Sequence, residues 1–334
     1  MSRQGGISHS CISHSCISHW DDARTGRGER GHIAGTWQSL TGRTSQTVGV
    51  KRIQVDPGKW STPLHMEGAE EEIFYVLGGS GLSVQWEGDG ELDELPAYDV
   101  SEGDCVVHLA LENAHTLQAG PDGLDVLAFG QRTYAAGVTW LPRAGVAWLG
   151  NTWGLVGGED DHPWAREAGA GPPVVGEPSP RPKNIVNAAD LEPVERDAAT
   201  VGRRIRDLAR AAGSQRTGLR HSDVLPGKLG SAPHCHSAEE EIFVVLEGDG
   251  HLLLWEDDGV AEHAVRRGSV VARPAGTGVA HAFRAGDAGL TLLMYGTRDP
   301  NDMCFYPRSG KVMFRGLGLI TRLGDRVDYW DGED

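Results

Sequence analysis

The hexapeptide Ala69-Glu70-Glu71-Glu72-Ile73-Phe74 occurs a second time, without change, as Ala238-Glu239-Glu240-Glu241-Ile242-Phe243. Around it, residues 48–90 align with residues 217–259 at a constant separation of 169 positions, and roughly half of the aligned residues are identical. The match continues to later positions, where His115 aligns with His281. Two long copies, rather than many short ones, indicate a duplicated domain and not an array of small repeats.

The composition and the hydrophobic pattern predict an all-β fold. The 334 residues suffice for two domains that each bury a core. The chain contains 47 glycines and 17 prolines, which suits many short strands joined by turns. Short β-rich runs in the second copy, separated by glycine-containing turns, are residues 242–246, 251–255, 269–272 and 290–295. This spacing is typical of a barrel or a sandwich.

The same pattern predicts four regions: a disordered tail (1–35), a first barrel (36–150), a Pro/Gly-rich linker (151–185) and a second barrel (186–334). A short amphipathic helix is expected after the linker, because apolar residues recur at helical spacing before Gly213, namely Val201, Ile205, Leu208 and Ala212. The tail holds an ISHSC tandem repeat whose His and Cys residues either chelate a soft metal or are simply unstructured.

Charge and apolar content exclude several classes of function. The formal net charge of -16 disfavours nucleic acid and anionic membranes as partners. No apolar stretch approaches the roughly 20 residues that span a bilayer, and the N-terminus lacks the apolar segment of a signal peptide. We therefore expect a cytoplasmic protein. Its five cysteines follow no disulfide-framework spacing, so structural disulfides are not expected.

A set of metal-ligating residue types stands in the second copy. His234 and His236 are two positions apart, so both side chains project from one face of an extended strand while Cys235 faces the other way. Glu241 and His281 follow at the starts of later β-rich stretches. Three imidazoles and one carboxylate suit a divalent first-row ion and leave positions for water or substrate. The alternative is a set of satisfied structural histidines.

These residues resemble the two short motifs of the cupin superfamily. The first motif is present as His234-Cys235-His236, four residues, Glu241, six residues and Gly248. The second is present as Gly268, five residues, Pro274-Ala275-Gly276 and then His281, although four residues rather than the usual two separate Gly276 from the histidine and no Asn follows. The resemblance implies two tandem cupin barrels of the double-stranded β-helix (jelly-roll) type. It also leaves Glu240 as an alternative to Glu241.

The first copy carries a related set: His65, Glu67, Glu72 and His115. A carboxylate replaces the second imidazole, and two histidines with two carboxylates can still bind a hard divalent ion such as Mn²⁺. The other possibility is a degenerate barrel that keeps the fold without the metal. The sequence leaves both possibilities open.

Further polar residues are candidates for secondary roles, each with a purely structural alternative. Arg273 and Arg298 are placed to hold an anionic substrate, and His108 and His162 to line a pocket or bridge the domains. Residues 306–309 are candidates for closing one barrel end.

The resemblance implies a metal-dependent enzyme of dioxygenase or decarboxylase type, acting on a small oxygenated or carboxylate substrate at the second barrel. Mn or Fe is the expected ion, with Zn or Ni as alternatives. A non-catalytic ligand-binding or scaffold protein and a sugar isomerase or epimerase are the competing hypotheses. No catalytic acid or base can be named from the sequence. A homodimer is a possible assembly.

Overall fold

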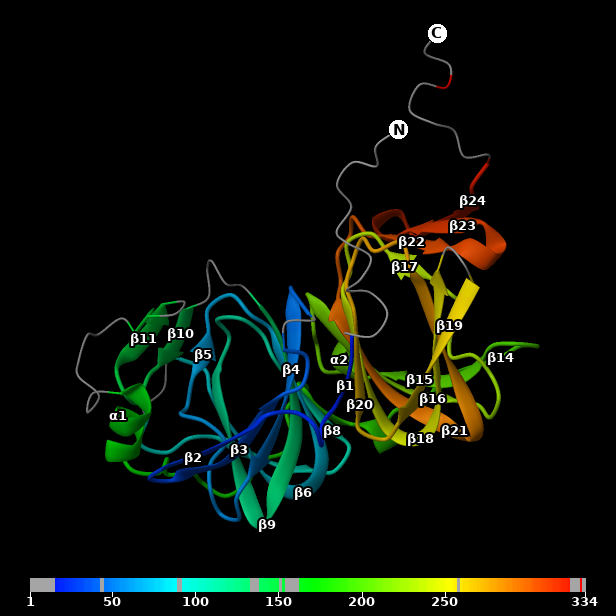
Figure 1. The fold of residues 1–334 in the computed structure, drawn as a ribbon. Coiled ribbons are helices and arrows are strands. Elements are labelled where there is room, and N and C mark those ends of the chain that lie inside the picture. Colours follow the sequence, from blue (N-terminus) through cyan, green and yellow to red (C-terminus); the bar gives the residue numbers. More distant parts are fainter. Residues whose placement is uncertain are drawn as a thin grey trace.

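The computed structural model describes residues 16–42, 45–88, 92–132, 138–149, 152–153, 162–256, 259–324 and 331. The ISHSC repeat lies outside the described residues except for Cys16, the last residue of its second unit. The described chain is almost entirely β-structure and forms two large sheets of eight strands and two small sheets of four. The two halves lie side by side, each built around one large sheet and one small sheet (Figure 1). The expected all-β, two-barrel fold is confirmed.

The large sheet of the first barrel has the strand order β13-β8-β6-β9-β4-β3-β2, with β7 paired to β6. Its small sheet has the order β12-β11-β10-β5. The strands are β2 (Thr25–Arg30), β3 (Ile33–Ser39), β4 (Val48–Val55), β5 (Met66–Glu67), β6 (Glu72–Trp86), β7 (Ala97–Ser101), β8 (Asp104–His108), β9 (Ala114–Gln131), β10 (Val138–Leu141), β11 (Val146–Leu149), β12 (Thr152–Trp153) and β13 (Ile185–Asn187).

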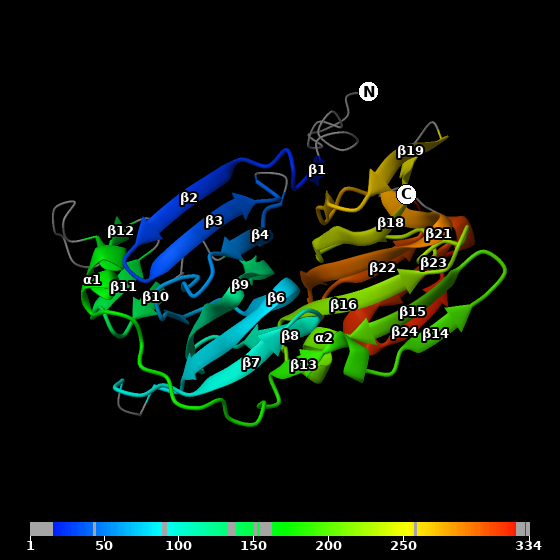
Figure 2. The same cartoon turned by 90° about the horizontal axis from the view of Figure 1, so that it is seen from below.

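The second barrel repeats this plan with the order β1-β20-β18-β21-β16-β15-β14, β19 pairing with β18, and a small sheet β17-β22-β23-β24. Figure 2 shows the large sheets from below. The strands are β1 (Ile17–His19), β14 (Val194–Asp197), β15 (Gly202–Asp207), β16 (Thr217–Val224), β17 (Cys235–His236), β18 (Glu241–Glu256), β19 (Gly259–Arg266), β20 (Ser269–Arg273), β21 (Ala280–Thr297), β22 (Met303–Tyr306), β23 (Lys311–Phe314) and β24 (Leu319–Arg322).

The first part of strand β18, residues 242–245, is buried on both faces because it separates two cores. Phe243 and Val245 point into the second barrel, whereas Ile242 and Val244 point into a core shared by the two barrels. Strand β6 alternates in the same way, which explains the almost continuous apolar run after each Glu-Glu-Glu sequence. Since side chains alternate along a strand, Glu241 lies on the interior face with Phe243.

The turn expected at Gly248-Asp249-Gly250 lies instead inside the single long strand β18. The register against β21 shifts between Val245 and Glu247 and again between Gly248 and Gly250. Gly248 has a φ of 75°, and a Cβ there would lie 2.2 Å from the carbonyl oxygen of Gly289. Only glycine fits this kink, which therefore bends a continuous strand rather than ending it.

The expectation of a disordered tail over residues 1–35 is wrong for its described part, residues 16–35. Strand β1 pairs antiparallel with β20 of the second barrel, placing Ile17 opposite Val271. Trp20, only 7% exposed, enters the core shared by the barrels. These contacts order a short polar segment whose partner strand is about 250 residues away in the sequence, and local pattern does not reveal such pairing.

The helix expected over residues 201–212 is largely a strand. β15 occupies Gly202–Asp207, where Ile205 pairs with both Val194 and Ser222, so sheet pairing overrides the helical spacing. Helix α2 (Leu208–Ala211) keeps one turn, capped by the Asp207 side chain. The expected linker contains helix α1 (Pro163–Gly169), and the described residues also include the short 3₁₀ helices η3 (Ala188–Asp190), η4 (Pro307–Ser309) and η5 (Arg315–Leu317). No helix in the described ranges is long and apolar enough to cross a membrane.

Candidate metal centre

The fold brings the four predicted residues of the second barrel together. His236 lies in β17, Glu241 begins β18, His281 lies in β21, and His234 is held against His281 by two backbone hydrogen bonds of 3.2 and 2.8 Å. Oε2 of Glu241 lies 3.1 Å from Nε2 of His281, 3.5 Å from Nε2 of His236 and 3.9 Å from Nε2 of His234. One carboxylate oxygen therefore faces three imidazole nitrogens.

The free atoms of this cluster fit a metal ion. Nε2 of His236, Nε2 of His281 and Oε2 of Glu241 are buried without a hydrogen-bond partner. In His234 and His236 the ring nitrogen Nδ1 has a hydrogen-bond partner. Nδ1 of His234 lies 2.8 Å from the carbonyl oxygen of Ala232, and Nδ1 of His236 lies 2.7 Å from Oδ2 of Asp302. Both oxygens are acceptors, so the Nδ1 atoms carry the protons and the Nε2 lone pairs face Glu241.

The pKa shifts of His234, His281 and Glu241 agree with this arrangement, whereas at His236 the hydrogen bond with Asp302 outweighs burial and raises the pKa. Burial lowers the pKa of His281 to about 3 and also lowers the pKa of His234, so both imidazoles are neutral. Burial alone would raise the pKa of Glu241, but the neighbouring His281 and His236 outweigh it and hold that pKa well below its usual range. Neutral imidazoles beside an ionised carboxylate are the forms that bind a divalent ion.

Arg273 shares the small cavity beside these residues. The cavity measures about 10 Å³, and its lining includes His236, Glu241, His281 and Arg273. Arg273 pairs with Glu241 across β20 and β18, so both side chains occupy the same face. The guanidinium is 3% exposed, donates through Nη2 to the carbonyl oxygen of Val279 at 3.0 Å, and leaves Nε without a partner. Arg298, the other predicted anion-binding residue, instead pairs with Asp207 at 3.1 Å.

Glu240, the sequence alternative to Glu241, points away from this cluster. Its carboxylate accepts hydrogen bonds from the backbone N–H groups of Gln46 and Thr47 in the first barrel, at 2.7–3.1 Å. The alternation along β18 forces this result, since neighbouring residues face opposite sides.

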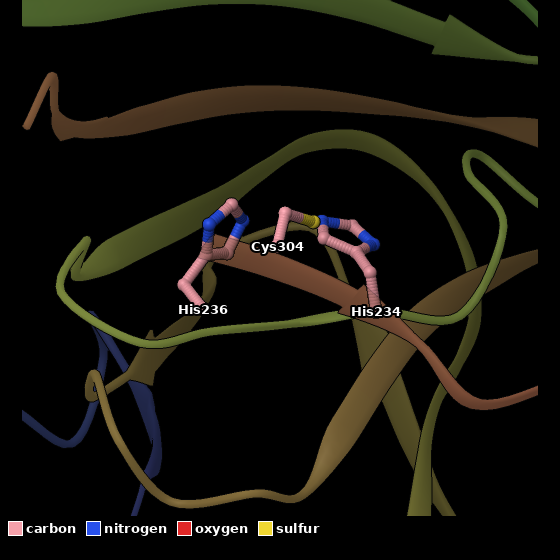
Figure 3. A group of neighbouring side chains, drawn as sticks. All are labelled: His234, His236 and Cys304. Carbon is pink, nitrogen blue, oxygen red and sulfur yellow. The ribbon is translucent and has the colours of Figure 1, made fainter. Parts of the chain in front are cut away.

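The C-terminal segment supplies two neighbours that sequence analysis did not find. Asp302 is 1% exposed and accepts from the backbone N–H of Ala238 at 3.0 Å in addition to its contact with His236. Cys304 in β22 lies beside His234 and His236, and Figure 3 shows the three side chains together. Neither residue belongs to the repeat, so no motif marked them. Tyr306, in the segment expected to close a barrel end, stacks on His234 with ring centroids 5.8 Å apart.

The first barrel also brings its predicted residues close together, and His65, Glu72 and His115 form a group that could hold a metal ion, as His234, Glu241 and His281 do in the second barrel. Nε2 of His115 lies 3.0 Å and Nε2 of His65 lies 3.4 Å from Oε2 of Glu72. Glu67 is 4.0 Å from His65 and accepts the hydroxyl of Thr139 at 3.0 Å. Burial raises the pKa of Glu67 to about 7. The Glu67 carboxylate is thus bonded to Thr139, and it lies about as far from His65 as Glu241 lies from His234 in the second barrel, where that distance is 3.9 Å.

The other two predicted histidines take different roles. His108 is buried in the first barrel, where its ring stacks on His115 with centroids 3.8 Å apart, and its Nδ1 lies 2.9 Å from the Asn113 side chain. Burial lowers the pKa of His108 well below its usual range. His162 caps α1 by accepting from the backbone N–H of Trp164 at 3.2 Å.

Comparisons with known proteins agree with this architecture. Residues 220–295 match the family model described as a cupin domain, and no curated protein matches the sequence. Oxalate decarboxylase from Bacillus subtilis at pH 4.6 is 19% identical, with a TM-score of 0.59 over 87% of this chain and 76% of that one. The formate complex of Lactobacillus farciminis oxalate decarboxylase is 17% identical, with a TM-score of 0.60 over 89% of each chain. A B. subtilis oxalate decarboxylase studied for its Mn(II) centres is 17% identical, with a TM-score of 0.59 over 87% and 78%. At these identities the likeness shows a shared fold.

Proposed function

We propose that this protein, a two-domain member of the cupin superfamily, is a metal-dependent enzyme that decarboxylates a small carboxylic acid in its second barrel. His234, His236, Glu241 and His281 would hold a divalent ion, since the unpartnered buried atoms of the last three converge and Nε2 of His234 lies 3.9 Å from Oε2 of Glu241. Mn²⁺ or Fe²⁺ suits three nitrogens and one oxygen. When bound, the ion supplies a Lewis acid that polarises a substrate carboxylate. Oxalate decarboxylases of the same fold support this choice of reaction.

The buried guanidinium of Arg273 is the observation that supports an acidic substrate. A cation that is 3% exposed, with an N–H that lacks an acceptor, lines the same cavity as three of the proposed ligands. Leaving such a donor unpaired is costly, and a carboxylate is the complementary acceptor. The cavity of about 10 Å³ has room for about one water molecule, so even an acid as small as oxalate would enter only with movement of the lining side chains. Arg273 would bind and orient the acid, and the surrounding buried side chains would exclude water.

The test begins with metal content and then measures turnover. Wild type, His236→Ala and Glu67→Ala are purified without added metal and analysed for bound elements. We expect about one equivalent in wild type and in Glu67→Ala, and loss in His236→Ala, because only His236 belongs to the proposed centre. The loaded enzyme is then offered oxalate and other small acids while CO₂ release and O₂ consumption are recorded.

Arg273→Gln and its matched control Arg298→Gln separate substrate binding from general charge effects. We expect kcat/KM to fall about 100-fold in Arg273→Gln, because a charge-assisted hydrogen bond to the substrate is lost, and to stay near wild type in Arg298→Gln. Equal activity of Arg273→Gln and wild type would refute the role of Arg273. Acid binding without CO₂ release would favour a ligand-binding protein, and O₂ consumption would favour a dioxygenase.

A further inference from the structure

Cys304 faces the same side of its sheet as the proposed ligand His236. β22 pairs antiparallel with β17, and the register places Cys304 directly opposite His236 and Phe305 opposite Cys235. Opposed residues of antiparallel strands share a face. Tyr306, two residues after Cys304, lies against the ring of His234, which agrees with this alternation. The side chain of Cys304 therefore belongs with the metal-ligating histidines.

The distances allow the sulfur to share a metal with both histidines. One ring nitrogen of His234, one of His236 and Sγ of Cys304 all lie within 4.8 Å of one another. Cys304 is 1% exposed, and Figure 3 shows its Sγ directed toward the imidazole of His234. Nε2 of His236 is buried without a hydrogen-bond partner. His234 also belongs to the group that it forms with Glu241 and His281, so the two groups meet at one residue.

The first barrel offers an internal contrast at the equivalent position. There β10 pairs with β5, and Thr139 stands opposite Glu67 as Cys304 stands opposite His236. Thr139 donates its hydroxyl to both carboxylate oxygens of Glu67 at 3.0 Å. The first barrel therefore combines a hydroxyl with a carboxylate, whereas the second combines a thiol with an imidazole. Soft sulfur and imidazole donors select different ions from hard oxygen donors.

We propose that Cys304 is an additional ligand of the second-barrel metal and coordinates it as a thiolate. Cys304 would supply a soft sulfur donor to a bound ion, and its thiol proton would be released on binding. This inference rests on the metal site of the proposed function and adds a ligand to it. A sulfur ligand shifts the preference of the centre from Mn²⁺ toward Fe²⁺, Co²⁺ and Zn²⁺.

Co²⁺ titration of the metal-free, full-length protein tests the sulfur ligand directly. We expect a near-ultraviolet thiolate-to-Co²⁺ charge-transfer band in wild type and in Cys105→Ser, the control at a buried free cysteine of the first barrel. Cys304→Ser should lose this band while keeping the weaker visible Co²⁺ bands of nitrogen and oxygen coordination. Its Co²⁺ affinity should fall about tenfold or more, and its Mn²⁺ affinity should change much less.

The outcomes distinguish the added ligand from the site itself. Visible Co²⁺ bands without a charge-transfer band in wild type, or a band that survives in Cys304→Ser, would refute Cys304 and leave the metal site standing. Absence of any Co²⁺ uptake by wild type would overturn both proposals. Cys304→Ala serves as a second variant if the serine disturbs folding, and X-ray absorption of the Zn²⁺ form should show sulfur at about 2.3 Å in wild type alone.

Discussion

Asp302 fixes the orientation of the proposed metal ligand His236 through a hydrogen bond to its ring. Its Oδ2 lies 2.7 Å from Nδ1 of His236, while Oδ1 accepts from the backbone N–H groups of Ala238 at 3.0 Å and Glu239 at 3.2 Å. The carboxylate thereby holds the His236 proton on Nδ1 and leaves the Nε2 lone pair for a metal.

Asp302→Asn should therefore weaken metal binding by about 10–100-fold, because an amide N–H would favour the proton on Nε2 instead. Competition with a chromophoric chelator measures the affinity. Asp299→Asn is the control, since its carboxylate accepts only from the backbone N–H of Asn301 at 2.8 Å among the hydrogen bonds found in the described residues. Equal affinities of Asp302→Asn and wild type would show that Asp302 does not position His236.

Sequence spacing could predict a group of four residues, His234, His236, Glu241 and His281, because the first three stand in one short motif. The structure brings these residues together, including His281, despite its unusual distance from Gly276. Asp302 and Cys304 could not be predicted. Their contacts depend on the pairing of β22 with β17, which lie about 70 residues apart in the sequence. The repeat does not extend to these positions, so the first copy shows no matching motif.

At the scale of elements, strand β1, which lies near the N-terminus of the sequence, forms one edge of the large sheet of the second barrel. It covers the exposed side of β20, and the backbone N–H of Trp20 donates to the carbonyl oxygen of Gly268 at 3.1 Å. The indole fills the core between the barrels and stacks under the guanidinium of Arg52, 4.4 Å from the ring centroid.

Trp20→Ala should lower the free energy of unfolding by about 3–5 kcal/mol, because a buried aromatic side chain is replaced by a cavity. Thermal unfolding gives the loss of stability, and amide hydrogen exchange at Val270 and Ala272, whose N–H groups face β1, should accelerate as β1 detaches. Trp140→Ala is the matched control: Trp140 is 38% exposed, so its loss should cost about 1 kcal/mol. Equal melting temperatures of Trp20→Ala and wild type would contradict this role of β1.

The elements that the sequence predicts well are strands whose own residues form a clear β-rich run. The β-rich run after Glu241 and the run at residues 269–272 both form strands, in β18 and β20. Residues 202–207 were mistaken for helix because Ile205 fits both periodicities, and only the pairing with β14 and β16 decides between them. Strand β1 is too short and polar to carry a signal of its own.

At the scale of the molecule, the two barrels share one hydrophobic core, and each barrel contributes one carboxylate that accepts hydrogen bonds from the other barrel. Trp20, Ile73, Tyr75, Ile242 and Tyr295 are among the buried residues of this common core. Unfolding one barrel would expose the apolar face of the other, so we expect a single cooperative transition for the whole chain.

Glu71 and Glu240 are equivalent residues of the two copies, and each is bonded to the opposite barrel. Glu71, 1% exposed, accepts from the backbone N–H groups of Gln215 at 2.8 Å and Thr217 at 3.0 Å, and from the Ser214 hydroxyl at 2.6 Å. Glu240 makes the reciprocal contacts with the loop at Gln46. The second glutamate of each Glu-Glu-Glu sequence therefore joins the barrels, while the third faces a barrel interior.

Glu71→Ala should destabilise the protein by about 3 kcal/mol or more, because several buried donors lose their acceptor at once. Differential scanning calorimetry should show a melting temperature several degrees lower, and Glu240→Ala should behave alike. With both residues changed, the barrels should begin to unfold separately, and the calorimetric enthalpy should exceed the van't Hoff value. Glu102→Ala, an exposed carboxylate of the same barrel as Glu71, should leave the transition unchanged. A double variant that kept the wild-type transition would mean that the shared apolar core alone joins the barrels, since the carboxylates would then add nothing measurable.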